Sequence, residues 1–113
     1  MSKTVNIDVA TDLLILKRVY KLTAKERRDL IGLTQPQVVK LQAGKNSNPV
    51  AQRYLHGIRI FLDSLAEIVK VEAIPSWLRK KNAAFQNRQP LRVIKDGEID
   101  LLREMVHRLS GSS

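Results

Sequence analysis

The chain of 113 residues contains no cysteine and few aromatic residues, with one Trp, two Tyr and two Phe. The absence of cysteine excludes a disulfide framework and a thiolate metal site, and it is compatible with a reducing compartment. Long apolar runs are also absent, because the N-terminal part has only the stretch from Leu13 to Leu16 between charged residues. The sequence therefore predicts neither a signal peptide nor a transmembrane helix, and we expect a soluble, cytoplasmic protein.

The residue patterns of a catalytic centre are missing as well. The sequence has no paired carboxylates, no nucleophile with an adjacent base, no glycine-rich phosphate loop and no cluster of metal ligands. Only His56 and His107 could act as bases near neutral pH, and the sequence shows an orienting partner for neither. We therefore expect no enzymatic activity, no bound metal and no cofactor.

Acidic residues are outnumbered, since 11 Asp and Glu stand against 20 Lys and Arg, which gives a formal net charge of +9. A polyanion is the natural partner for such a chain, although a basic surface can also serve solubility alone. Much of the charge lies in two clusters. The first basic cluster comprises Lys17, Arg18, Lys21, Lys25, Arg27 and Arg28, and the second comprises Arg79, Lys80, Lys81, Arg88, Arg92 and Lys95.

Apolar residues recur at helical spacing and no strand-like alternation is present, so we expect an all-α fold. A first helix is expected from about Val9 to Tyr20. The next begins at a T-x-x-E capping box, in which Thr23 and Glu26 each satisfy a backbone N–H that the first turn leaves unpaired. That helix is expected to end near Gly32, because glycine readily adopts the left-handed conformation that stops a helix.

A second capping box, T-x-x-Q, follows at Thr34–Gln37, with Pro36 in the first turn, where a missing N–H costs little. The helix that it opens is expected to run to Ala43 and to stop at Gly44. Two short helices joined by a tight turn form a helix-turn-helix motif, whose second helix lies in a major groove of DNA.

The segment GLTQPQVVKLQAG resembles the recognition-helix segment of phage-repressor-like (Xre-type) proteins. A glutamine amide offers a donor and an acceptor and so matches adenine N6 and N7, a lysine can reach a guanine or a phosphate, and a helix N-terminus favours a phosphate. The expected DNA-binding residues are therefore Thr34, Gln35, Gln37, Lys40, Lys45 and Ser47. The alternative is that the two glutamines are simply exposed first-turn residues of a bundle helix.

Two departures from the Xre-like pattern bear on this interpretation. Arg27 and Arg28 occupy positions where Xre-like helices usually carry Leu and a small residue, and such bulky charges would push the helices apart or rotate them. Ala24 stands where phage repressors often have a glutamine that braces the first recognition glutamine.

A longer helix is expected after Asn48 as N-cap and Pro49 at the first helical position. Its wide apolar stripe predicts that part of the helix seals a homodimer, which would place two recognition helices about one turn of duplex apart. The stripe consists of Tyr54, Leu55, Ile58, Phe61, Leu62, Leu65, Ile68 and Val69. Pro75 is expected to stop this helix, and Ser76 to cap a short one. Further helices are expected from Pro90 toward Gly97 and from Ile99 to Leu109.

The pattern W-L-x-x-x-N-x-x-F-x-x-R-x-P-L begins at Trp77, and DGE and an amphipathic helix ending at Gly111 follow it. This segment resembles the C-terminal toxin-binding segment of the MbcA/ParS/Xre antitoxin family. The resemblance implies a helix-turn-helix domain for DNA binding and dimerisation in residues 1–72 and a toxin-binding domain in residues 73–113. The toxin-binding residues that it implies are Trp77, Asn82, Asn87, Arg88, Pro90 and Arg92. For Arg88, an internal salt bridge that holds the turn is an equal alternative.

By the same resemblance the partner is a RES-domain toxin that consumes NAD+, or one that transfers ADP-ribose from it. The antitoxin's C-terminal part would cover the toxin's active site, and the complex would repress its own operon. Lys81 replaces a proline often found before the family asparagine, and Ser112 and Ser113 follow Gly111 where relatives usually have an apolar or aromatic residue. This divergence favours a second hypothesis, a stand-alone or phage-derived transcriptional regulator without a toxin partner.

Overall fold

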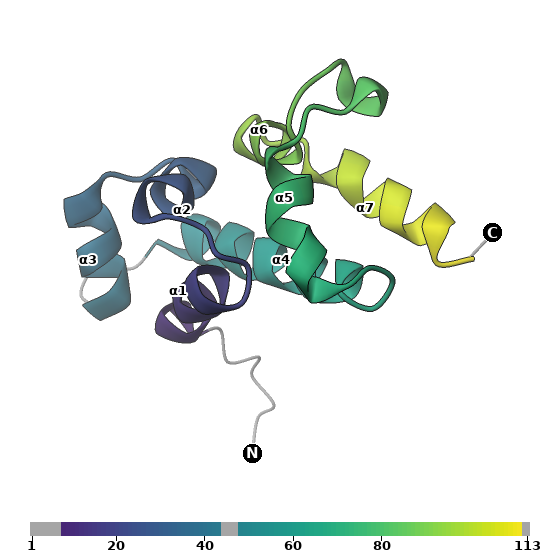
Figure 1. Cartoon of the computed structure of the whole chain (residues 1–113). Coiled ribbons are helices and arrows are strands. Elements are labelled where there is room, and N and C mark those ends of the chain that lie inside the picture. The colour runs from purple at the N-terminus through teal and green to yellow at the C-terminus, as the bar shows by residue number, and fades with distance from the viewer. Residues whose placement is uncertain (1–7, 44–47, 112–113) are drawn as a thin grey trace.

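The computed structural model describes residues 8–43 and 48–111, and in these ranges helices joined by turns and loops make up the chain, with one isolated antiparallel bridge between Asn82 and Arg88. The helices are α1 (Val9–Arg18), α2 (Ala24–Ile31), α3 (Gln35–Ala43), α4 (Pro49–Leu65), α5 (Ile74–Arg79), α6 (Pro90–Lys95) and α7 (Ile99–Leu109) (Figure 1). Single 3-10 turns, η1 (Val71–Ala73) and η2 (Ala83–Phe85), precede α5 and α6. The predicted all-α fold is confirmed.

Local capping signals start the N-terminal helices at the predicted residues. In the first box, the Glu26 N–H donates to Thr23 Oγ1 at 3.1 Å and the Thr23 N–H donates to Glu26 Oε1 at 2.8 Å. Gly32 ends α2 with a φ of 68°, a conformation that strains any residue with a Cβ atom. The predicted stop of α3 at Gly44 falls outside the described residues.

The helix α4 is shorter than its apolar stripe predicts. It begins at Pro49, with the Asn48 side chain accepting the Ala51 N–H at 3.2 Å, but it ends at Leu65. Ile68 and Val69 therefore lie beyond α4, in a turn whose N–H groups donate back to the Leu65 carbonyl. The chain reverses here, and the reversal brings α5 back against the core.

The predicted roles of Pro75 and Ser76 are wrong. Pro75 is the second residue of α5, and Ala73, whose side chain makes no capping hydrogen bond, precedes the helix. Proline is tolerated in this position because the N–H groups of a first turn have no intrahelical acceptor. Ser76 lies inside α5 and caps nothing.

One hydrophobic core runs through both halves of the described chain. The fully buried apolar residues include Leu16, Leu55, Ile58 and Leu62 from the first half and Ile74, Leu78, Val93, Ile94 and Leu102 from the second. Each such side chain stabilises the fold by about 1.5–3 kcal/mol relative to an exposed one. α4 contacts α1 on one side and α7 on the other, and α2 packs against α6. Residues on both sides of position 72 belong to this one core, so the two predicted domains stabilise one another. The domain division at residue 72 stays a prediction.

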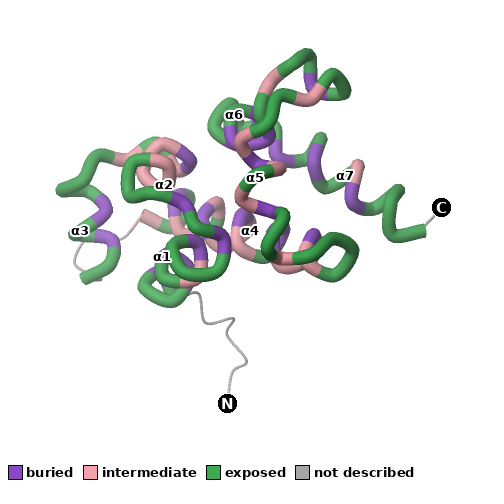
Figure 2. Tube along the Cα trace, in the orientation of Figure 1, coloured by how far each residue is buried: buried purple, intermediate pink, exposed green. Residues whose placement is uncertain are grey.

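The overall arrangement places α3 and α7 at opposite ends of the molecule, with α4 between them (Figure 1). Most of α3 is exposed, and only its inner side is buried (Figure 2). A surface that could enter a groove of DNA is thus distant from the last helix.

A polar network around the buried Asp12 carboxylate joins α1 to α4 at the edge of the core. The carboxylate of Asp12, which is 1% exposed, lies 3.1 Å from His56 Nδ1 and 3.3 Å from Arg59 Nη1. Arg59 also pairs with Asp63 at 2.8 Å, and the Tyr20 hydroxyl donates to Asp63 at 2.5 Å. Burial, reinforced by the Asp63 carboxylate, raises the pKa of Tyr20 well above its ordinary value. Asp12 is thus the partner of His56, which the sequence did not show.

Candidate DNA-binding helix and partner-binding loop

The helix-turn-helix consists of α2, the turn at Gly32–Thr34 and α3. The turn is closed by the Gly32 N–H, which donates to the Asp29 carbonyl at 3.2 Å, and by the Leu33 N–H, which donates to the Arg28 carbonyl at 3.1 Å. Val38 and Leu41 are buried, and α3 packs against α1. These contacts determine which side of α3 remains in solvent.

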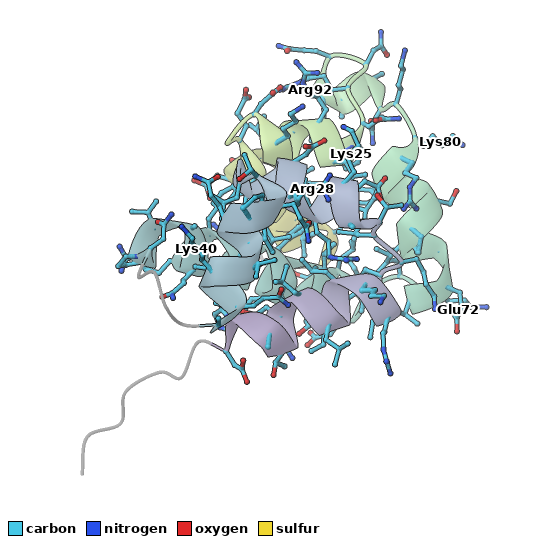
Figure 3. The ribbon with its side chains drawn as sticks, turned by 90° about the vertical axis from the view of Figure 1, so that its left-hand side faces the viewer. Lys25, Arg28, Lys40, Glu72, Lys80 and Arg92 are labelled. Atoms are coloured by element: carbon cyan, nitrogen blue, oxygen red, sulfur yellow. The ribbon has the colours of Figure 1, made fainter. Side chains whose placement is uncertain are left out.

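The predicted DNA-binding residues within the described ranges are all on the exposed side of this motif. Thr34, Gln35, Gln37 and Lys40 are exposed, and Figure 3 shows Lys40 of α3 and Arg28 of α2 on one face of the molecule. Lys45 and Ser47, also predicted to contact DNA, lie outside the described residues. The base or phosphate that each residue contacts stays a prediction.

Both glutamine side chains use their carbonyl oxygen within the protein. Gln35 Oε1 accepts from Arg28 Nη1 at 3.2 Å. Gln37 Oε1 accepts from the Thr34 N–H at 2.8 Å and from the Thr34 hydroxyl at 3.1 Å. In return, the backbone N–H of Gln37 donates to Thr34 Oγ1 at 3.4 Å. These last three contacts form the T-x-x-Q capping box that the sequence predicts.

Arg27 and Arg28 both donate hydrogen bonds within the helix-turn-helix, and their expected effect on the spacing of the helices stays a prediction. Arg27 Nη1 donates to the Leu22 carbonyl at 2.6 Å, just before α2, and Arg28 reaches forward to Gln35. Arg28 therefore braces Gln35, a contact that the short side chain of Ala24 cannot make. The contact between Arg28 and Gln35 joins two helices across the turn, so the residue pattern within α2 alone does not predict it.

A cavity of about 230 Å³ lies between α1, α2 and α3, and its lining includes Lys17, Arg27, Arg28 and Gln35 but no acidic side chain. Burial and the neighbouring charge of Arg28 lower the pKa of Arg27. The lining of this cavity is therefore basic, which suits a phosphate, while the Asp29 carboxylate lies close enough to Arg28 for the two charges to interact.

Arg79 links the C-terminal part to the first capping box. Its Nη2 and Nε lie 2.7 and 3.0 Å from the two carboxylate oxygens of Glu26, and the same guanidinium donates to the carbonyls of Lys21 at 2.8 Å and Pro75 at 3.1 Å. Burial alone would raise the pKa of Glu26, but the hydrogen bonds from Arg79 and from the Thr23 N–H outweigh it and lower that pKa. Arg79 thus ties α5 to the start of α2.

The segment from Asn82 to Arg88 forms a closed loop around η2. The Asn82 N–H donates to the Arg88 carbonyl at 3.1 Å, the Asn82 side chain accepts the Ala84 N–H at 2.9 Å, and Phe85 is buried beneath the loop. Asn87 is exposed and has a φ of 61°, which asparagine adopts more readily than most residues. Asn82 is thus engaged within the loop, and Asn87 faces solvent.

Arg88 has the internal role that the sequence left as one of two alternatives. Its Nη1 lies 3.1 Å from both Asp96 and Glu98, and its Nε donates to the Phe85 carbonyl at 3.0 Å. The carboxylate of Glu98, followed by that of Asp96, raises the pKa of Arg88. The carboxylates of Asp96 and Glu98 therefore neutralise part of the positive charge of the second basic cluster.

The other predicted toxin-binding residues differ in exposure. Trp77 is half-buried and packs against the core, Pro90 is buried at the first position of α6, and Arg92 is exposed and pairs with Asp96 at 3.0 Å. The exposed lysines Lys80 and Lys81 lie directly before the loop. Arg92, Asn87 and these lysines are among the exposed polar groups available for direct contact with a partner.

Within the described ranges, no helix is both long and apolar enough to cross a membrane, and no group of three or more His, Cys, Asp or Glu residues could hold a metal ion. The fold and its surfaces define the chain as an all-α protein that combines a helix-turn-helix with a C-terminal helical unit. No protein-family model matches the sequence, and no curated protein matches it.

A solved structure, the crystal structure of the M. tuberculosis MbcT–MbcA toxin–antitoxin complex, contains a chain with the same fold. The similarity has a TM-score of 0.73 at 21% sequence identity, and it covers 95% of this chain and 96% of that chain. It therefore extends over the helix-turn-helix and the C-terminal unit together, and it agrees with the fold that the resemblance to the MbcA/ParS/Xre family implied.

Proposed function

We propose that this chain is an MbcA-like antitoxin, a binding protein that neutralises a toxin and represses its own operon in the cytoplasm. The observation that carries this proposal is the structural match over 95% of the chain to a chain of a toxin–antitoxin complex. The motif that begins at Trp77 supports the same family from the sequence alone. The two lines of support agree, although they rest on different features.

The toxin that this family implies is of the RES-domain or ADP-ribosylating type, which acts on NAD+. An interface that excludes water around its hydrogen bonds needs apolar anchors within a polar surface. The C-terminal surface has both, because Trp77 lies half-buried near the loop and Asn87, Lys80 and Arg92 are exposed around it. Asn82, Arg88 and Pro90 would act indirectly, since they hold the loop in shape.

The DNA-binding part of the proposal rests on the exposed first turn of α3 and on the first basic cluster. Lys17, Arg27 and Arg28 line a cavity whose lining contains no acidic side chain. Each phosphate that these groups neutralise releases a counterion, so the affinity for DNA should fall steeply as salt rises. Affinity that does not change between low and physiological salt would contradict this part.

A homodimer would let two copies of α3 reach successive major grooves. The candidate surface is a cavity of about 350 Å³ between α4 and α7, lined in part by Ile60, Phe61, Ile68 and Val106. Ile60 is 47% exposed and Ile68 is 36% exposed, so this face has apolar area to bury. Sedimentation of the purified chain tests the proposal, and Ile60→Glu should shift a dimer toward monomers.

Neutralisation is tested by expressing the toxin encoded beside this gene, with and without the antitoxin, and measuring growth. The full chain should restore growth, and the double reversal Lys80→Glu and Lys81→Glu at the loop should weaken the rescue. Lys17→Glu, a reversal near α3, is the control and should rescue as well as the wild type. If the wild-type chain binds its upstream DNA but never relieves the toxin, the chain is a stand-alone regulator.

A further inference from the structure

The amide orientation of Gln37 is determined by its neighbour. Its Oε1 accepts from the Thr34 N–H at 2.8 Å and from the Thr34 hydroxyl at 3.1 Å. A backbone N–H can only donate, so the atom that faces it must be the carbonyl oxygen rather than the amide nitrogen. A carbonyl oxygen has two lone pairs, and both are used here. The exposed end of Gln37 is therefore its NH2 group, which can only donate.

Gln35 is oriented in the same sense from α2. Its Oε1 accepts from Arg28 Nη1 at 3.2 Å, and a guanidinium has no acceptor with which to reverse the pairing. The Gln35 NH2 group is thus left for other partners. Lys40, one turn further along the exposed side, carries an ammonium group that also only donates. No acidic residue lies in the first turn of α3.

These groups select among the edges that DNA bases present in the major groove. Guanine shows two adjacent acceptors, N7 and O6, whereas adenine shows an N6 donor beside its N7 acceptor and cytosine shows a donor. A side chain whose carbonyl is occupied cannot accept from adenine N6. The bidentate pairing of Gln35 or Gln37 with adenine, expected from the sequence, would require the contact with Arg28 or Thr34 to break.

We infer that α3 reads guanine edges through the donor groups of Gln35, Gln37 and Lys40, with the Thr34 cap and the Arg28 brace holding the carbonyls of Gln37 and Gln35 away from the bases. This inference rests on the proposed DNA binding and specifies which bases are read. Thr34 and Arg28 are positioning residues, because they act on the bases through the two glutamines.

The first test is selection of binding sites for the full-length protein from random duplexes. Guanine is expected at the positions that α3 contacts. Replacing such a guanine by 7-deazaguanine, which lacks the N7 acceptor, should weaken binding by about two- to tenfold, the usual range for one hydrogen bond. The same replacement at a position outside the selected site should have no effect.

The second test uses Gln37→Glu, which keeps the capping box, because Glu26 holds the same position in the first box. The substitution replaces the exposed donor group by an acceptor and should reduce the preference for guanine over adenine by roughly two- to tenfold. Gln42→Glu, on the last turn of α3, adds the same charge and is the control that should retain the preference. Arg28→Met frees the Gln35 carbonyl and should raise the relative affinity for adenine at one position.

The outcomes separate this inference from the function on which it rests. If no sequence is enriched, both the DNA-binding proposal and the inference fail. If sites are enriched but carry adenine at the α3 positions, or if 7-deazaguanine binds as well as guanine, the protein binds DNA and the donor-only reading is wrong.

Discussion

Arg79→Met removes the guanidinium that joins the C-terminal part to the helix-turn-helix while retaining most of the apolar stem. The variant loses two contacts with Glu26, at 2.7 and 3.0 Å, and two with the carbonyls of Lys21 and Pro75. The Arg79 side chain is 36% exposed and that of Glu26 is 25% exposed, so solvent screens the ion pair. We expect the free energy of unfolding to fall by roughly 2–3 kcal/mol, most of it from the hydrogen bonds.

Urea unfolding of the full chain, followed by circular dichroism, measures this loss. Lys80→Met is a matched control, because it removes the same charge from the next residue, which is exposed. The control should change stability by less than about 0.5 kcal/mol. A loss that small in Arg79→Met as well would refute the view that Arg79 connects the two parts.

A double-mutant cycle isolates the contribution of the ion pair. Glu26→Gln removes the charge but keeps the capping box, as Gln37 does in the second box. The coupling between the two substitutions should be about 1 kcal/mol, since the pair is partly exposed. Zero coupling would show that the loss in Arg79→Met comes from hydrogen bonds that do not depend on the charge of Glu26.

The pH dependence supplies an independent check. Although burial tends to raise the pKa of Glu26, hydrogen bonds from Arg79 and from the Thr23 N–H lower it in the folded chain. A lowered folded pKa stabilises the protein above the pKa of the unfolded chain, and the gain is lost as pH falls through the folded value. The stability difference between wild type and Arg79→Met should therefore shrink in acid. A difference that stays constant would contradict this account.

Three further substitutions test other features of the fold by urea unfolding. Asp12→Asn should destabilise the chain by about 2–3 kcal/mol, because it removes a buried carboxylate that faces two cationic or hydrogen-bonding groups of α4; a loss under 0.5 kcal/mol would make this network dispensable. Gly32→Ala should cost about 1–2 kcal/mol from its φ of 68° alone, since a Cβ atom there meets nothing within 4 Å. Asn48→Ala should cost about 1 kcal/mol through loss of the α4 cap, and no change would show that solvent replaces it.

The sequence by itself determined the features that depend on neighbours a few residues apart. The capping boxes at Thr23 and Thr34 and the caps at Asn48 and Gly32 are local, so the starts of α2 and α4 and the end of α2 could be predicted. The T-x-x-Q box also carried a signal that was missed, because a glutamine that caps a helix has its carbonyl occupied. The orientation of Gln37 was therefore present in the sequence.

The tertiary structure alone decided which charged groups meet. Glu26 and Arg79 are 53 residues apart, and Asp12 and His56 are 44 residues apart, so no spacing rule could pair them. The end of α4 at Leu65 also depends on tertiary structure. The chain reverses after Leu65 and returns Ile74 to the core, whereas the apolar stripe alone predicts a longer helix. A helix start is specified by hydrogen bonds within one turn, whereas the partner of a long charged side chain depends on the packing of the whole chain.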